Sequence, residues 1–184
     1  MKATGIVRRI DDLGRVVIPK EIRKTMRIRE GDPLEIYTDR EGEVIFKKYS
    51  PIGELASFAA QYAETLHKTC SLSVVICDRD AVIACSGVPR KEYTDKALSE
   101  ELESIIEGRG LYFHREESDP VPVLAEGGSF YVSCAMPIIS EGDIVGCVAS
   151  VTDRNADTRR DMPAEVESKL ILTAAGFLGR QLES

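Results

Sequence analysis

The first 50 residues alternate in polarity as β-strands do, yet they carry too few apolar side chains to bury a core of their own. The pattern predicts two short strands, a helix and a hairpin, over residues 4–10, 15–18, 20–27 and 34–47. Small domains of this size usually need a metal, disulfides or a partner chain. The segment has neither a metal-ligating cluster nor a cysteine. It therefore predicts an intertwined homodimer that pools two small cores.

The rest of the chain predicts a second, larger domain. Residues 49–53 form a short linker, and we place the domains at residues 1–50 and 51–184. The predicted helices cover residues 54–69, 92–107 and 163–182, and the predicted strands cover residues 72–77, 81–85, 111–115, 129–139 and 143–152. This order indicates an α+β domain with an antiparallel sheet and flanking helices.

Charge separates the two parts. Residues 1–50 hold 12 Lys and Arg against 9 Asp and Glu, whereas residues 51–184 hold 12 against 22. Such asymmetry suggests an electrostatic partner for the basic part. Arg8, Arg9 and Arg15 flank the predicted turn at residues 11–14, and further basic residues lie on the helix that follows. Guanidinium groups on rigid elements can bind phosphates and base edges; the alternative is that they only keep a small dimer in solution.

Several classes of protein are disfavoured by the composition. No stretch approaches the roughly 18 unbroken apolar residues of a membrane-spanning helix, and the first residues do not read as a signal peptide. The five cysteines include no Cys-x-x-Cys pair, and most have apolar neighbours. We expect a reduced, cytoplasmic protein with no metal and no cofactor.

The segment from Thr4 to Arg23, with Gly-Arg-Val-Val-Ile-Pro at residues 14–19, resembles the AbrB-type transition-state regulators. The resemblance continues through residues 34–37 and 47–49. It implies a dimeric, swapped-hairpin β-barrel that binds double-stranded DNA. The family's DNA-contacting basic positions match Arg8, Arg9, Arg15, Arg23 and Lys24. The resemblance departs at Arg27, where close AbrB-type relatives carry glycine at the helix end.

Residues 134–139 and 142–149 resemble a pair of strands in GAF sensor domains. GAF domains bind small ligands or act as dimerisation modules. The Asn-Lys-Phe-Asp-Glu signature of the cyclic-nucleotide-binding members is absent, so that ligand class is disfavoured. An AbrB-type head joined to a GAF-like tail resembles a family of sporulation regulators. This pairing implies a non-enzymatic transcription regulator, acting as activator or repressor, whose tail assembles the protein. The tail either senses an unidentified small molecule or only raises the valency of DNA binding.

Within the GAF-like part, we expect an effector pocket between the sheet and residues 91–128. Ligand pockets combine apolar walls with a few convergent polar groups, and Ser86, Arg90 and Ser133 are the candidates here.

The last helix carries two apolar stripes, one of Val166, Leu170, Ala174 and Phe177 and the other of Ile171, Ala175, Leu178 and Leu182. We expect one stripe to pack on the sheet and the second to meet a partner helix. Two dimer contacts on one chain can close a homotetramer.

Two other functions stay open. One is an antitoxin that binds a toxin through its C-terminal part, although antitoxins with this type of head usually carry a short disordered tail. The other is a thiol enzyme, because some GAF-fold enzymes reduce free methionine sulfoxide. A nucleophilic cysteine needs an electropositive, partly exposed site. Cys85 is the least buried candidate in the sequence, and we expect no catalytic residue.

Overall fold

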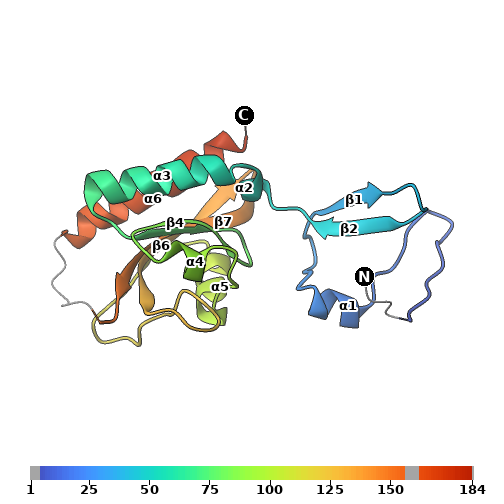
Figure 1. Ribbon diagram of the computed structural model, residues 1–184, viewed down its shortest axis with the longest axis horizontal. Helices are drawn as coiled ribbons and strands as arrows, with labels where there is room; N and C mark the ends of the chain where they lie inside the picture. The colour runs from blue at the N-terminus through green and yellow to red at the C-terminus, as the bar shows by residue number, and fades with distance from the viewer. Residues whose placement is uncertain (1–4, 156–161, 184) are drawn as a thin grey trace. The chain divides into compact units, whose positions relative to one another are not determined.

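The computed structural model describes residues 5–155 and 162–183 of the chain. The chain divides into two units, Met1–Tyr49 and Ser50–Ser184, and each is described by itself below. Figure 1 shows the N-terminal unit in blue and the helices and strands of the C-terminal unit from cyan to red.

The N-terminal unit contains one short helix and one hairpin. Helix α1 spans Lys20–Thr25, and strands β1 and β2 span Leu34–Thr38 and Val44–Lys48. The strands pair antiparallel with Leu34 opposite Lys48 and Thr38 opposite Val44. The Asp39 carboxylate closes the hairpin turn, because it accepts hydrogen bonds from the Glu41 and Glu43 amides at 3.0 and 2.8 Å. The predicted hairpin is therefore present.

The two strands expected at residues 4–10 and 15–18 are not formed within one chain: residues 5–19 contain no strand in the structure. Only the turn between them is closed, by a hydrogen bond from the Asp11 amide to the Arg15 carbonyl at 3.0 Å. The apolar side chains of this segment face solvent in the single chain, with Val7 86% and Val17 70% exposed. Strands with an apolar face need a partner for their backbone groups and for that face, and one chain supplies neither.

The C-terminal unit is built on a five-stranded sheet in the order β4-β3-β7-β6-β5. The strands span Val74–Cys77 (β3), Val82–Ser86 (β4), Tyr112–Phe113 (β5), Phe130–Ser140 (β6) and Asp143–Asp153 (β7). All neighbouring strands pair antiparallel. The long β6–β7 hairpin forms the centre of the unit, and the predicted α+β class with an antiparallel sheet is confirmed.

Helices cover both faces of this sheet (Figure 1). On one face lie α2, Pro51–Glu54, α3, Ala56–Cys70, and α6, Ala164–Gln181. Their buried residues share a core with alternate residues of the sheet, such as Val74, Ile76 and Val148. On the other face lie α4, Arg90–Tyr93, and α5, Glu100–Glu107, over Val75, Cys147 and their neighbours. The period-two alternation of the strands thus divides the apolar residues between two cores.

The single helix expected over residues 92–107 is wrong, because the structure has α4 and α5 with a bent segment between them. Asp95 adopts a left-handed backbone at φ 62°, and Ala97 and Leu98 form isolated bridges to Ala81 and Leu124. A new helix begins after Ser99, whose hydroxyl accepts a hydrogen bond from the Leu102 amide at 3.1 Å. The helix expected over residues 54–69 is confirmed as α3, and the short helix α2, which Ser50 caps, precedes it.

Within the described residues, no helix is long and apolar enough to cross a membrane. The same part of the chain has no group of three or more His, Cys, Asp and Glu side chains placed to hold a metal ion.

Candidate nucleic-acid interface

The five predicted DNA-contacting residues all lie on the N-terminal unit, and all five are exposed: Arg8, Arg9, Arg15, Arg23 and Lys24. Arg8 and Arg9 precede the turn at residues 11–14, and Arg15 follows it. Arg23 and Lys24 lie in the last turn of α1. Cations are favourable there, because the helix macrodipole places partial negative charge at the C-terminus.

Arg15 is oriented by the turn it follows. The Asp11 carboxylate accepts hydrogen bonds from the Leu13 amide at 3.0 Å, the Arg15 amide at 2.7 Å and the Arg15 Nε at 2.8 Å. Gly14 completes the turn with φ 76°, which a residue with a Cβ rarely adopts. Two hydrogen bonds from Arg15 lower the pKa of Asp11 below its ordinary value of 3.8. The bond from the Arg15 amide has the larger effect, and the bond from the Arg15 side chain has the smaller one.

The Asp11 contact matters for recognition because a guanidinium held through Nε can still present its terminal amino groups to a phosphate or a base. Sequence reasoning assigned Asp11 to a turn and missed this positioning role. The available signal was its spacing of four residues from Arg15, around a glycine.

Helix α1 is fixed at both ends by residues outside it. Pro19, the residue before the helix, is buried. At the other end, the Lys48 ammonium donates a hydrogen bond to the Arg27 carbonyl at 2.8 Å and lies 3.5 Å from Asp32 Oδ2. The position of Arg23 and Lys24 therefore depends on a lysine more than twenty residues later in the chain, which local pattern could not reveal.

The three residues predicted to bind an effector are not brought together. Ser86 ends β4 and Ser133 lies in β6, and strands β3 and β7 separate them in the sheet. At about 4.8 Å per strand, the two backbones are about 14 Å apart. Arg90 is exposed at the start of α4. Ser133 is buried, and its hydroxyl is already hydrogen-bonded to that of Thr152.

The space between the sheet and residues 91–128 is lined by buried apolar side chains. Tyr93, Leu98 and Leu102 are fully buried there. The Tyr93 hydroxyl accepts a hydrogen bond from the Phe130 amide at 3.1 Å, and burial raises the pKa of that hydroxyl. The effector pocket stays a prediction.

The stripe of the last helix that contains Leu178 was expected to meet a partner helix, but in the structure it faces the sheet. Leu178 is 0% exposed and packs on the sheet together with Ile171 and Ala175. Phe177 of the other stripe is 40% exposed, and its ring contacts Phe58 and Tyr62 of α3 at 5.8 and 5.6 Å between centroids. Val166 and Phe177 are thus the exposed members of their stripe, whereas Ala174 between them is buried.

The cysteines follow the sequence expectation. Cys77, Cys134 and Cys147 are buried in strands, and Cys85 is partly exposed. The side-chain contact with Cys147 and burial raise the pKa of the Cys77 thiol. These effects disfavour the thiolate that a nucleophilic cysteine must form.

Comparison with known proteins agrees with this arrangement. Residues 54–183 match the family described as "Stage V sporulation protein T C-terminal, transcription factor". Residues 7–53 match the family described as "Antidote-toxin recognition MazE, bacterial antitoxin". The chain is 52% identical to stage V sporulation protein T of Bacillus subtilis, over 100% of this chain and 99% of that protein.

Two other relatives cover parts of the chain. The transition state regulatory protein AbrB of Bacillus subtilis is 63% identical over 28% of this chain and 52% of its own length. A type II free methionine-R-sulfoxide reductase from Thermoplasma acidophilum has a similar fold, with a TM-score of 0.51 and 11% identity over 72% of this chain and 95% of that one. At this identity the similarity shows the fold alone.

The similarity that extends over the whole chain favours the transcription regulator over the other functions left open by the sequence. The antitoxin match is confined to residues 7–53, and the reductase shares only a fold. In contrast, one relative matches both units in a single chain, and a separate match covers residues 54–183. The chain belongs to the stage V sporulation protein T family.

Proposed function

We propose that this member of a family of DNA-binding sporulation regulators contacts duplex DNA through the arginines and the lysine of two paired N-terminal units. The observation that carries the proposal is the placement of five exposed cations, Arg8, Arg9, Arg15, Arg23 and Lys24, on a unit that is 63% identical over its length to AbrB. A DNA recognition domain is known for AbrB itself. Pairing of two units doubles the set of cations into one basic surface.

The exposed apolar side chains of the N-terminal unit support pairing. Val7, Ile10, Leu13, Val16 and Val17 are all exposed in the single chain, as are Ile36 and Phe46 on the hairpin. A soluble unit rarely leaves so much apolar surface uncovered. A second copy supplies both the missing apolar face and the missing strand partners for residues 5–18. The N-terminal unit is therefore a dimerisation unit.

We further propose that the C-terminal units associate through α3 and α6 and close a homotetramer. Val166 and Phe177 are exposed on one apolar stripe of α6, and the Phe177 ring lies against Tyr62 of α3. A second copy of the same helix pair could cover this stripe by helix-to-helix packing. Two different self-association surfaces on one chain produce a closed tetramer.

The C-terminal unit has no proposed catalytic role. Three of its cysteines are fully buried, and the described residues contain no metal-ligating cluster. We expect the protein, a cytoplasmic regulator, to show no methionine sulfoxide reductase activity.

A salt titration of DNA binding tests the proposed function. The full chain is titrated onto a labelled duplex of about 40 base pairs, roughly four helical turns, at several salt concentrations. Affinity should fall steeply with salt because several phosphates are neutralised. Arg8→Ala, Arg15→Ala and Arg23→Ala should each weaken binding, by about 10-fold or more where a bidentate base contact is lost. The proposal fails if all three variants are folded dimers that bind as the unmodified chain does.

A further inference from the structure

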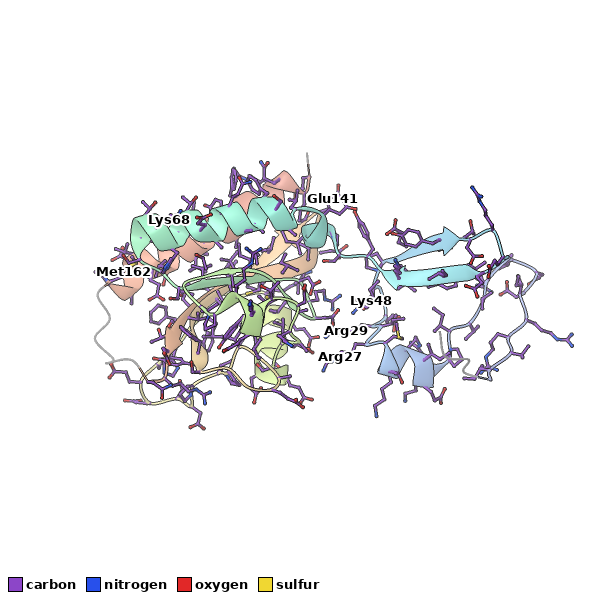
Figure 2. The ribbon with its side chains drawn as sticks, in the orientation of Figure 1. Arg27, Arg29, Lys48, Lys68, Glu141 and Met162 are labelled. Carbon is purple, nitrogen blue, oxygen red and sulfur yellow. The ribbon has the colours of Figure 1, made fainter. Side chains whose placement is uncertain are left out.

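Three separate parts of the N-terminal unit meet at the ammonium group of Lys48, the last residue of β2. The ammonium donates a hydrogen bond to the carbonyl of Arg27, just beyond helix α1, at 2.8 Å, and it lies 3.5 Å from Asp32 Oδ2. Figure 2 shows Arg27, Arg29 and Lys48 on one side of the N-terminal unit. The lysine thus joins the end of the helix, the loop that follows it and the hairpin.

The Asp32 carboxylate is the buried part of this arrangement. Its side chain is 4% exposed, whereas that of Lys48 is 25% exposed. The carboxylate also accepts a hydrogen bond from the Arg29 amide at 2.8 Å, and the Asp32 amide donates to the Arg29 carbonyl at 3.2 Å. A buried carboxylate needs hydrogen bonds and a cation to replace the water that it loses. These contacts therefore hold the loop after α1 in one conformation.

A single peptide group connects Lys48 to the backbone of a proposed DNA-binding residue. The Arg27 carbonyl, which accepts from Lys48, and the Ile28 amide belong to the same planar peptide group. The Ile28 amide donates in turn to the Arg23 carbonyl at 2.8 Å. Lys48 itself is fixed by its pairing with Leu34 in the hairpin. Movement of the ammonium would therefore displace the end of α1 that carries Arg23.

A lysine on the basic unit could instead be one more phosphate contact, but its surroundings favour the internal role. A carboxylate 3.5 Å away offsets the charge that would attract a phosphate, and the ammonium already donates to a carbonyl inside the unit. Lys47, one residue earlier, is different. It is exposed, and its ammonium lies 4.7 Å from the centroid of the Tyr37 ring.

We propose that Lys48 and Asp32 are positioning residues for DNA binding, which act through helix α1 and do not touch the duplex. The pair fixes the direction in which Arg23 and Lys24 leave the helix. This inference rests on the proposed function, because it assigns a role to residues that support two of the five proposed DNA contacts.

The test measures DNA binding by the full chain and by three variants, on a duplex of about 40 base pairs and at a temperature where circular dichroism shows all of them folded. Lys48→Gln and Asp32→Asn should each weaken binding about fivefold or more, the effect of one lost contact. The double variant should bind no more weakly than the weaker single variant, because the two residues act as one unit.

The result for Asp32→Asn separates positioning from charge, because removal of a negative charge from a DNA-binding unit otherwise strengthens binding. The matched control is Glu30→Gln, which removes the same charge from an exposed residue two positions earlier. Glu30→Gln should bind at least as well as the unmodified chain. Arg23→Ala is the reference for a lost DNA contact.

Reductive methylation of lysines, located by mass spectrometry, provides a second readout on the unmodified chain. Lys48 should react slowly without DNA, because its ammonium is held by two groups inside the unit, whereas the exposed Lys47 should react fast. Addition of DNA should slow the reaction of Lys24, a proposed DNA contact, and should leave that of Lys48 unchanged.

The possible results distinguish the two roles. If Asp32→Asn binds at least as well as the unmodified chain while Lys48→Gln binds weakly, Lys48 is a direct contact and the inference is overturned. It is also overturned if both variants bind normally while Arg23→Ala binds weakly, which leaves the proposed function intact. If the variants do not fold, the methylation decides: protection of Lys48 by DNA overturns the inference, and slow, unchanged reaction supports it. Failure of the unmodified chain to bind DNA would overturn both this inference and the proposed function.

Discussion

Asp11 shows how a single acidic residue can serve a basic surface. Its charge opposes DNA, yet its carboxylate closes the turn at residues 11–15 and holds Arg15 through the amide and Nε. The place of Arg15 directly after this turn was predictable from the sequence, and its contact with DNA stays a prediction. The role of Asp11 was not predictable, because a turn residue and a positioning residue have the same local pattern.

Substitution of Asp11 by alanine should therefore weaken DNA binding, even though it removes a negative charge from the basic unit. The matched control is Asp12→Ala, which removes the same charge one residue later from an exposed position. Asp12→Ala should bind DNA at least as well as the unmodified chain, and Asp11→Ala should bind several-fold more weakly, approaching Arg15→Ala. A salt titration of each variant measures the difference. Equal affinities for the two variants would show that Asp11 does not orient Arg15.

The pH dependence of the turn follows from the lowered pKa of Asp11. A carboxyl group whose pKa is lower in the folded state contributes stability above its unfolded pKa and loses it as the pH falls through the folded value. That window lies below the ordinary value of 3.8. The turn should thus stay closed from pH 5 to 8, and the backbone resonances of residues 11–15 should not titrate in that range. A midpoint above pH 4 would contradict the assignment.

At the scale of helices and strands, the local sequence pattern predicted the type of most elements. It failed where contacts with residues distant in the sequence determine whether an element forms or where it ends. The β6–β7 hairpin and helix α6 lie within two residues of their predicted ends. The helix expected over residues 92–107 breaks because Ala97 and Leu98 pair with strands and loops elsewhere. The strands expected at residues 4–10 and 15–18 do not form, since their partners are not in the same chain.

Helix α6 depends on a close approach to the sheet at Gly179. A Cβ at this position would lie 2.3 Å from the Ile139 carbonyl oxygen, a backbone atom that cannot move aside alone. Gly179→Ala should therefore destabilise the C-terminal unit by about 1–3 kcal/mol, the usual cost of overpacking a core. The control is Gly176→Ala on the same helix, where a Cβ meets nothing within 4 Å. That change should stabilise by up to about 1 kcal/mol through helix propensity.

Urea unfolding of the full-length variants, followed by far-UV circular dichroism, measures both effects. Gly179→Ala should lower stability and Gly176→Ala should raise it, although the two residues lie three apart on the same helix. A difference in helix propensity alone cannot produce opposite changes in stability from the same substitution. If Gly179→Ala were as stable as Gly176→Ala, α6 would have room to shift, and the tight contact with β6 would not hold the helix in place.

At the scale of the whole molecule, charge and resemblance predicted two units from the sequence, and the fold class and family are confirmed. It also predicted two apolar stripes on the last helix, but the expectation that the stripe with Leu178 meets a partner helix is wrong, because that stripe packs on the sheet. Neighbouring stripes of a helix differ by less than one turn, so only the packed structure decides. Because Leu178 is fully buried, a charge there would disrupt the core rather than an interface.

The tetramer is therefore tested at Phe177, which is 40% exposed. Phe177→Glu should place a charge between paired helices, whose burial without a partner is unfavourable, and should split the tetramer into dimers joined by their N-terminal units. Leu111→Glu is the control, because Leu111 is equally exposed, at 43%, and lies outside α3 and α6. Sedimentation velocity measures the assembly, and circular dichroism confirms that both variants are folded.

A tetramer carries two DNA-binding heads joined through their tails. The split into dimers should therefore also reduce the avidity for long duplexes that span both heads, while leaving the affinity for a short duplex unchanged. A Phe177→Glu variant that sediments as the unmodified chain does would place the second self-association surface elsewhere, and one that sediments as a monomer would show that the N-terminal units do not pair without it.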